Sequence, residues 1–193
     1  MSSISSLRLP TLGDVVPGGL ARNIALVVGG AVFVGLTAQL SVPLPFTPVP
    51  LSLQTFSVLL SGAVLGSRRG LLSMALYALA GMAGVPWFAQ HHSGWSFPTF
   101  GYVVGFVLAA VVVGRLAERG ADRTLLRSVA MMVLGNLAIY AVGAPWLMLS
   151  TGMSLPVALA KGVVPFLVGD AIKIAVAAGL LPAAWKLVNS GRR

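Results

Sequence analysis

Acidic residues are rare in this chain, and one of them falls inside a long apolar stretch. The 193 residues include four Asp and Glu, of which three lie in polar segments (Asp14, Asp122 and Glu118). Asp170 lies among apolar residues, and Lys173 follows three positions later, on the same face of a helix. A carboxylate inside a membrane is costly and normally faces a partner or a cavity. Two interpretations stay open, a structural Asp–Lys pair and a polar ligand site, and they overlap because a ligand can insert between the charges.

Two amides are the next candidates for polar chemistry. Asn136 lies in an apolar stretch one helical turn before Tyr140, and a buried Asn side chain offers both a donor and an acceptor. As a contact between helices it would contribute about 0.6 kcal/mol, and that role stays open beside ligand contact. Gln54 directly follows a proline-rich segment, so we expect it at the outer mouth of the site.

Aromatic residues gather in one connection of the chain. Six of them fall in the sixteen residues 87–102, namely Trp87, Phe88, Trp95, Phe97, Phe100 and Tyr102. A girdle at the membrane interface is the simpler interpretation of any single Trp. Six together, at the level of Gln54, favour the lid of an apolar pocket. The adjacent His91 and His92 lie in a loop and do not define a metal site, so we expect no metal.

The sequence does not match the common catalytic motifs. The chain has no cysteine, no His in a span to activate a serine, and no second carboxylate to face Asp170. It also lacks the H-E-x-x-H and Walker A motifs, so it does not hydrolyse ATP itself. We therefore predict a protein that is not an enzyme and needs no cofactor.

Composition identifies the elements that must position these groups. Hydrophobic residues make up 57% of the chain and charged residues 9%, against about 25% charged in soluble domains. At about 20 apolar residues per crossing, the sequence predicts an all-α integral membrane protein of one domain. An N-terminal tail, 1–22, precedes six expected spans, at about 23–40, 51–66, 71–86, 100–116, 128–149 and 163–182. The last apolar stretch, 155–188, contains three prolines and predicts a kinked helix. Four prolines between positions 43 and 50 exclude a helix from the first loop.

The basic residues indicate the orientation of this six-helix bundle. With six spans, 11 of the 13 basic residues fall on the side of the two termini: Arg8, Arg22, Arg68, Arg69, Arg115, Arg119, Arg123, Arg127, Lys186, Arg192 and Arg193. The positive-inside rule then places both termini in the cytoplasm. The net charge of +9 is explained by topology and lipid, so no nucleic-acid partner is predicted.

Small residues recur along the first span at a spacing of four. Ala21, Ala25 and Gly29 form one such set, and Ala31 with Gly35 forms another. This spacing allows close approach of a second helix. Packing within the bundle and docking of another subunit both stay open.

Five segments of the chain form an ordered set of motifs in loops as well as spans. They are Ala38–Thr55 (AQLSVPLPFTPVPLSLQT), Leu60–Gly70 (LSGAVLGSRRG), Pro98–Phe106 (PTFGYVVGF), Gly135–Tyr140 (GNLAIY) and Pro165–Lys173 (PFLVGDAIK). This set resembles the BioY family, the biotin-specific S components of energy-coupling factor (ECF) transporters, and the resemblance extends over about residues 21–182.

The resemblance implies a six-helix S component that captures biotin from outside, in the cytoplasmic membrane of a bacterium. It implies coupling to a transmembrane T subunit and two cytoplasmic ATPases, or uptake without them. Asp170 and Asn136 would bind the ureido group, and Lys173 would orient Asp170 or meet the ligand. Gln54 would lie at the mouth, and aromatic walls would cover the ring (Trp87, Phe88, Tyr102, Tyr140 and Trp146). Another vitamin-like ligand and a proton-coupled carrier are the alternatives.

Overall fold

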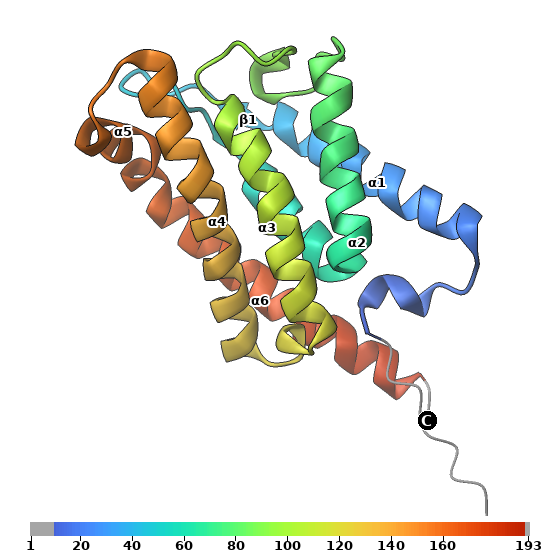
Figure 1. Ribbon diagram of the computed structural model, residues 1–193. Coiled ribbons are helices and arrows are strands. Elements are labelled where there is room, and N and C mark those ends of the chain that lie inside the picture. Colours follow the sequence, from blue (N-terminus) through green and yellow to red (C-terminus); the bar gives the residue numbers. More distant parts are fainter. Residues whose placement is uncertain (1–9, 192–193) are drawn as a thin grey trace, which may run out of the picture.

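The computed structural model describes residues 10–191 and consists mainly of long helices (Figure 1). The helices are α1 (Leu20–Gln39), α2 (Gln54–Met82), α3 (Phe100–Glu118), α4 (Leu125–Thr151), α5 (Leu155–Gly162) and α6 (Leu167–Ser190). Short 3-10 turns are η1 (Leu12–Val15), η2 (Ala89–His91), η3 (Ala121–Arg123) and η4 (Val164–Phe166). A two-residue strand on each side of the proline-rich loop, β1 (Ser41–Val42) and β2 (Leu51–Ser52), closes that loop into an antiparallel hairpin. The loop is therefore not helical, as its prolines predict.

Four helical segments are long and apolar enough to cross a membrane, namely 20–39, 100–118, 125–151 and 155–190. Their outer faces carry large apolar side chains: on α6 these recur every four residues, at Val168, Ile172, Val176 and Leu180. A soluble protein would not expose such a continuous apolar stripe. The helical membrane class predicted from composition agrees with this arrangement.

Helix α2 consists of two segments that fold back on each other. Gly66 interrupts it with φ 80° and ψ 175°, a conformation that residues with a Cβ rarely adopt. The Nε2 of Gln54 donates to the hydroxyl of Tyr77 at 2.6 Å, although the two residues are 23 positions apart. A straight helix would separate them by about 34 Å. The expected spans 51–66 and 71–86 thus correspond to the two halves of α2, joined by a single-residue turn.

The last apolar stretch differs from the single kinked helix that we expected. Helix α5 ends at Gly162 and α6 begins at Leu167, with Pro165 in the 3-10 turn between them. Proline removes a backbone donor and disfavours helical geometry in the residue before it, so the chain breaks here. Pro182 lies inside α6 without ending it.

The described part of the expected N-terminal tail is folded onto the bundle. Helix α1 begins at Leu20, and η1 precedes it with Thr11 buried. The guanidinium of Arg69 lies 2.8 Å from the Oδ1 of Asp14 and 3.1 Å from the hydroxyl of Thr11. Burial raises the pKa of Asp14, but the hydrogen bonds from Thr11 and Arg69 outweigh it and hold the pKa below its ordinary value. Arg8, Arg192 and Arg193 lie outside the described residues.

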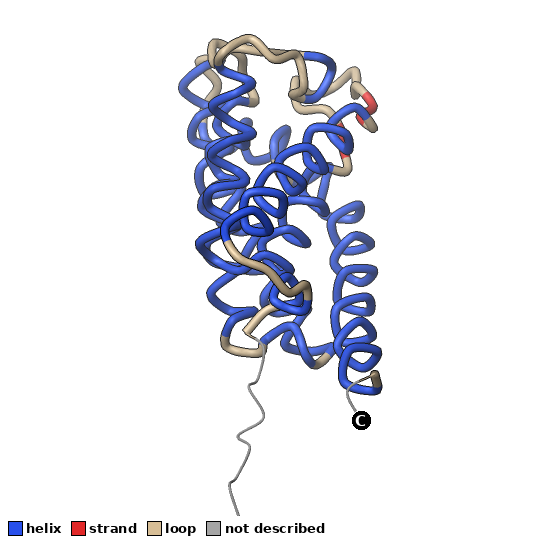
Figure 2. Tube along the Cα trace, turned by 90° about the vertical axis from the view of Figure 1, so that its right-hand side faces the viewer, coloured by secondary structure: helices blue, strands red, loops and turns tan. Residues whose placement is uncertain are grey.

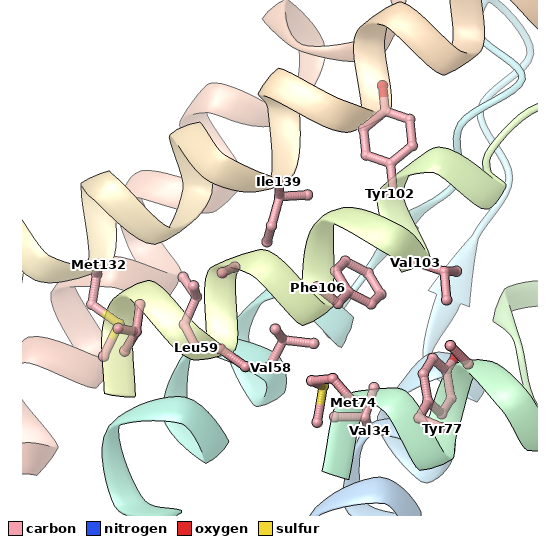
Figure 3. Packing of buried hydrophobic residues seen from close by; sticks show 14 of the residues in the cluster. Val34, Val58, Leu59, Met74, Tyr77, Tyr102, Val103, Phe106, Met132 and Ile139 are labelled. Atoms are coloured by element: carbon pink, nitrogen blue, oxygen red, sulfur yellow. The ribbon is translucent and has the colours of Figure 1, made fainter. Parts of the chain in front are cut away.

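The core lies where α3 packs between α2 and α4 (Figure 3). Val58 of α2, Phe106 of α3 and Ile139 of α4 are almost completely buried there. Both described ends of the chain lie at the same end of the bundle. The proline-rich loop between β1 and β2 and the connection that follows α2 lie toward the other end (Figures 1 and 2). That opposite end is where the candidate site forms.

Candidate ligand-binding site

The charged pair predicted from sequence is formed at the start of α6. The Nζ of Lys173 lies 3.2 Å from the Oδ1 of Asp170 and donates to the hydroxyl of Thr55 at 3.0 Å. Tyr140 of α4 donates its hydroxyl to the other carboxylate oxygen of Asp170. Asp170 is buried and lies in the first turn of α6, where the helix dipole favours a negative charge. Three helices therefore hold one carboxylate in a fixed position.

This carboxylate borders a partly enclosed cavity of about 560 Å³, a volume that counts all the space between its lining atoms and its open mouth. Mostly apolar walls with a few placed polar groups are typical of small-molecule sites. The polar lining groups are Ser52, Gln54, Thr55, Thr99, Tyr102, Tyr140, Asp170 and Lys173, and the apolar ones are Val49, Pro50, Phe88, Ala89, Phe97, Val103, Phe106 and Phe166. The walls of the cavity are thus mostly apolar, and the charged carboxylate of Asp170 is part of them.

The aromatic wall is built from rings that touch one another. Phe88 lies 5.6 Å from Phe97 and 6.3 Å from Phe100, centroid to centroid, and Tyr102 meets Tyr140 edge to face at 6.5 Å. Gly143 makes room for Tyr102, because a Cβ there would lie 2.6 Å from the ring. The hydroxyl of Tyr102 donates to the carbonyl of Gly162 at 2.8 Å, which fixes the ring against α5. These contacts hold the rings of the wall against one another and against α5.

Six of the nine residues predicted for the ligand line this cavity: Gln54, Phe88, Tyr102, Tyr140, Asp170 and Lys173. Trp87 lies behind the wall, with its ring 5.2 Å from Tyr77 and its Nε1 donating to the Tyr77 carbonyl. Trp146 stacks edge-on against Phe100 at 5.6 Å and donates to the carbonyl of Phe97. These two indoles support the wall rather than form it.

Asn136, the third predicted residue outside the main cavity, borders a narrow crevice of about 180 Å³ in total that has no room for a water molecule. Lys173 and Thr55 line both the cavity and the crevice, so Asn136 lies beside the charged pair. Its side chain is buried, and its Oδ1 accepts no hydrogen bond from any group in residues 10–191. Lys173 is the charged residue that lines the same crevice as this oxygen.

Comparison with known proteins identifies the family. Residues 5–190 match the sequence model of the BioY family. The chain belongs to the BioY family. A relative from Pyrococcus horikoshii named "Probable biotin transporter BioY" is 39% identical over 163 residues, 81% of this chain and 92% of the relative. The "Biotin transporter BioY" of Thermotoga maritima is 39% identical over 140 residues, 71% and 81% of the two chains. The resemblance seen in the sequence motifs is thereby confirmed.

A solved structure shares the fold. It is the S-component for biotin from an ECF-type ABC transporter, and it aligns with a TM-score of 0.77 and 21% identity over 86% of this chain and 92% of that one. Together with the apolar helices, the family makes this chain a multi-pass membrane protein. No group of three or more His, Asp or Glu side chains within residues 10–191 is arranged to hold a metal ion.

The structure separates the two sets of small residues on the first helix of this BioY member. Ala31 and Gly35 are buried, and Gly35 packs against the ring of Trp87. Ala21, Ala25 and Gly29 are exposed, and no atom approaches the position that a Cβ at Gly29 would occupy. Within residues 10–191, the set Ala21, Ala25 and Gly29 is therefore accessible to another protein, and the set Ala31 and Gly35 is not.

Sequence reasoning missed several lining residues. Thr55 donates to Asp170 at 3.4 Å and accepts from Lys173, but a lone Thr next to Gln54 carries no signal of its own. Ser57, one helical turn after Gln54, does not line the cavity and pairs with Thr37 of α1 at 2.6 Å. Phe166 enters from η4, a turn that the sequence did not predict.

Proposed function

We propose that this protein is the biotin-binding subunit of a membrane transporter, which captures biotin from the external side for uptake. The observation that carries the proposal is the partly enclosed aromatic cavity with the carboxylate of Asp170 at its wall. Membership of the BioY family, and the names of the relatives in it, support the choice of ligand.

The chemistry of biotin suits these groups. Biotin combines an apolar bicyclic ring with a ureido group, which has two N–H donors and one carbonyl, and with a valerate carboxylate. Asp170 would accept a ureido N–H in a charge-assisted hydrogen bond, and Phe88 and Tyr102 would cover the ring. Lys173 would orient Asp170 through their 3.2 Å contact. A dry site of this kind rejects analogues that leave a buried polar group unpaired.

Asn136 would influence the ligand site indirectly. Because it borders Lys173 and does not line the main cavity, we propose that it acts on the site through Lys173 rather than meeting biotin. Gln54 lines the cavity directly, and its Oε1 accepts from Ser52 at 3.3 Å, so it would fix the hairpin side of the pocket.

We also propose the topology and the partners. The two halves of α2 would each cross the membrane, giving six crossings with both termini in the cytoplasm of a bacterium. The basic residues at the end of the bundle that holds the described termini support this orientation. Ala21, Ala25 and Gly29 would dock a T subunit that works with two ATPases, and no catalytic centre would be needed in this chain.

Equilibrium binding of labelled biotin to the purified protein in detergent tests the proposal. Saturable retention near one biotin per chain is expected, with displacement by unlabelled biotin. Biotin methylated on both ureido nitrogens should fail to displace it, since neither nitrogen could then donate to Asp170. Absence of saturable binding in protein with the helical content of the structure would refute it.

A further inference from the structure

A second hollow lies on the outside of the bundle, between α1 and the second half of α2. It encloses about 1880 Å³, including the space open to the surroundings, and shares none of its lining with the ligand cavity. Figure 1 shows α1 crossing the bundle obliquely beside the second half of α2. Its walls are apolar: Ile24 and Val28 on α1 face Leu72, Leu76 and Leu79 on α2, and all five side chains are exposed.

One end of this groove carries arginines. Arg69 is neutralised by Asp14 at 2.8 Å, and Arg22 donates to the carbonyl of Val16 and to Asn23. Arg68 is exposed at the same end and makes no ion pair or hydrogen bond with any group in residues 10–191. The groove therefore combines an apolar body with an unpaired guanidinium at one end.

The length of the groove matches one leaflet of a bilayer. Arg68 and Leu79 are 11 positions apart on a continuous helix, which corresponds to about 16 Å. The hydrocarbon core is about 30 Å thick, so this is close to the depth of a single leaflet. The unpaired charge lies where a headgroup would lie, and the leucines lie along the path of an acyl chain.

We propose that this groove is a binding site for an anionic phospholipid, with the phosphate at Arg68 and one acyl chain along Val28, Leu72, Leu76 and Leu79. Where leucines line it, an unfilled groove forfeits dispersion contacts and offers water no hydrogen bonds. Basic pockets between membrane helices attract anionic headgroups. The site is independent of the ligand cavity, so it stands whether or not the protein binds biotin.

Native mass spectrometry of the purified full chain tests this site. The protein would be released from nanodiscs made of equal parts phosphatidylglycerol and phosphatidylcholine. One bound phosphatidylglycerol is expected to exceed one bound phosphatidylcholine by roughly fivefold. Arg68→Gln should bring this ratio to about one. Arg127→Gln, which removes an exposed arginine in the first turn of α4 outside the groove, should leave it unchanged.

A second variant addresses the apolar wall. Ala75 lines the groove and is partly buried, so Ala75→Phe should reduce bound lipid without changing the charge. Equal retention of the two lipids by the wild type would overturn the proposal, as would equal effects of Arg68→Gln and Arg127→Gln. Displacement of the lipid by millimolar inorganic phosphate would also overturn it, because an anion site would then suffice. Dimers without lipid in the same spectra would instead assign the groove to a second copy of the chain.

Discussion

The ammonium of Lys173 lies 3.2 Å from the carboxylate of Asp170, one turn earlier on α6, and Tyr140 donates to the second oxygen of that carboxylate. Both charges are largely shielded from solvent. Removing one member of such a buried pair leaves the other uncompensated, which costs more than the pair itself contributes. The pair is therefore the most sensitive point of the site.

Asp170→Asn should weaken biotin binding about tenfold or more, because it replaces a charge-assisted hydrogen bond with a neutral one and leaves Lys173 unpaired. Titration calorimetry of the purified variant in detergent measures this. Glu118→Gln is the control, since Glu118 accepts from Ser67 outside the cavity and its loss should not change affinity. Equal affinities for Asp170→Asn and wild type would remove Asp170 from the site.

Tyr140→Phe should weaken binding roughly five- to tenfold while Tyr102→Phe has a smaller effect. Both rings line the cavity, but the hydroxyl of Tyr140 donates to Asp170 and that of Tyr102 to the backbone of Gly162. A hydrogen bond to a charged group contributes about twice as much as a neutral one. Dissociation constants for biotin, measured side by side for the two variants, test this prediction. A larger loss of affinity in Tyr102→Phe than in Tyr140→Phe would contradict it.

The sequence predicted the charged part of the site because charge inside an apolar stretch is conspicuous. Asp170 and Lys173 are marked by residue type alone, and their spacing puts them on one face. Thr55 could not be found in this way, since its role depends on how the first half of α2 packs beside α6. Trp87 and Trp146 were predicted as ligand contacts but lie behind the cavity wall. Residue type identifies an aromatic side chain, but it does not show whether that side chain faces the cavity or packs behind its wall.

The helix boundaries also divide into those that the sequence predicted and those that it did not. Proline positions predicted the non-helical first loop. Apolar runs predicted where the long helices α1, α3 and α4 lie, but not that the last stretch divides into α5 and α6 or that α6 continues to Ser190. The six membrane crossings stay a prediction. The sharp turn at Gly66 was not predicted, because a glycine followed by Ser67 and Arg68 reads as an ordinary polar loop. Its single-residue form depends on Ser67, whose backbone N–H donates to Glu118 of α3 at 2.7 Å.

Asn136→Ala should affect binding only while Lys173 is present. Its buried oxygen shares the narrow crevice with Lys173 and is separate from the main cavity, so its influence must pass through the ammonium. A double-mutant cycle with Lys173→Met measures this dependence. Additive losses in affinity, or a loss from Asn136→Ala in the Lys173→Met background, would indicate direct contact between Asn136 and biotin.

Ala25→Trp and Ala31→Trp should separate docking from folding. Ala25 is exposed, so the larger ring should leave biotin binding intact but block copurification with a T subunit. Ala31 is fully buried, and overpacking there should lower the melting temperature. Copurification and thermal melts in detergent report the two effects. Unchanged assembly of Ala25→Trp would exclude the exposed face of α1 as the docking surface.

Stability should depend on pH through Asp122, at the other end of α6 from the ligand site. Its carboxylate is buried and accepts from the Nε1 of Trp185 at 2.5 Å, and the guanidinium of Arg123 lies 4.5 Å from that ring centroid. Burial raises the pKa of Asp122 above its ordinary value, although the hydrogen bond from Trp185 and the charge of Arg123 oppose the shift.

Because the folded state then binds the proton more tightly than the unfolded chain, the stabilisation from protonated Asp122 is present at low pH and is lost as pH rises through the raised pKa. Asp122→Asn keeps an acceptor for Trp185 and carries no charge, so its melting temperature should fall less than that of the wild type between pH 4 and pH 7. The chain has only four acids, and Glu118→Gln is a matched control for removing one at the same end of the bundle. Parallel pH profiles of wild type and Asp122→Asn, measured by circular dichroism in detergent, would show that Asp122 does not titrate with folding.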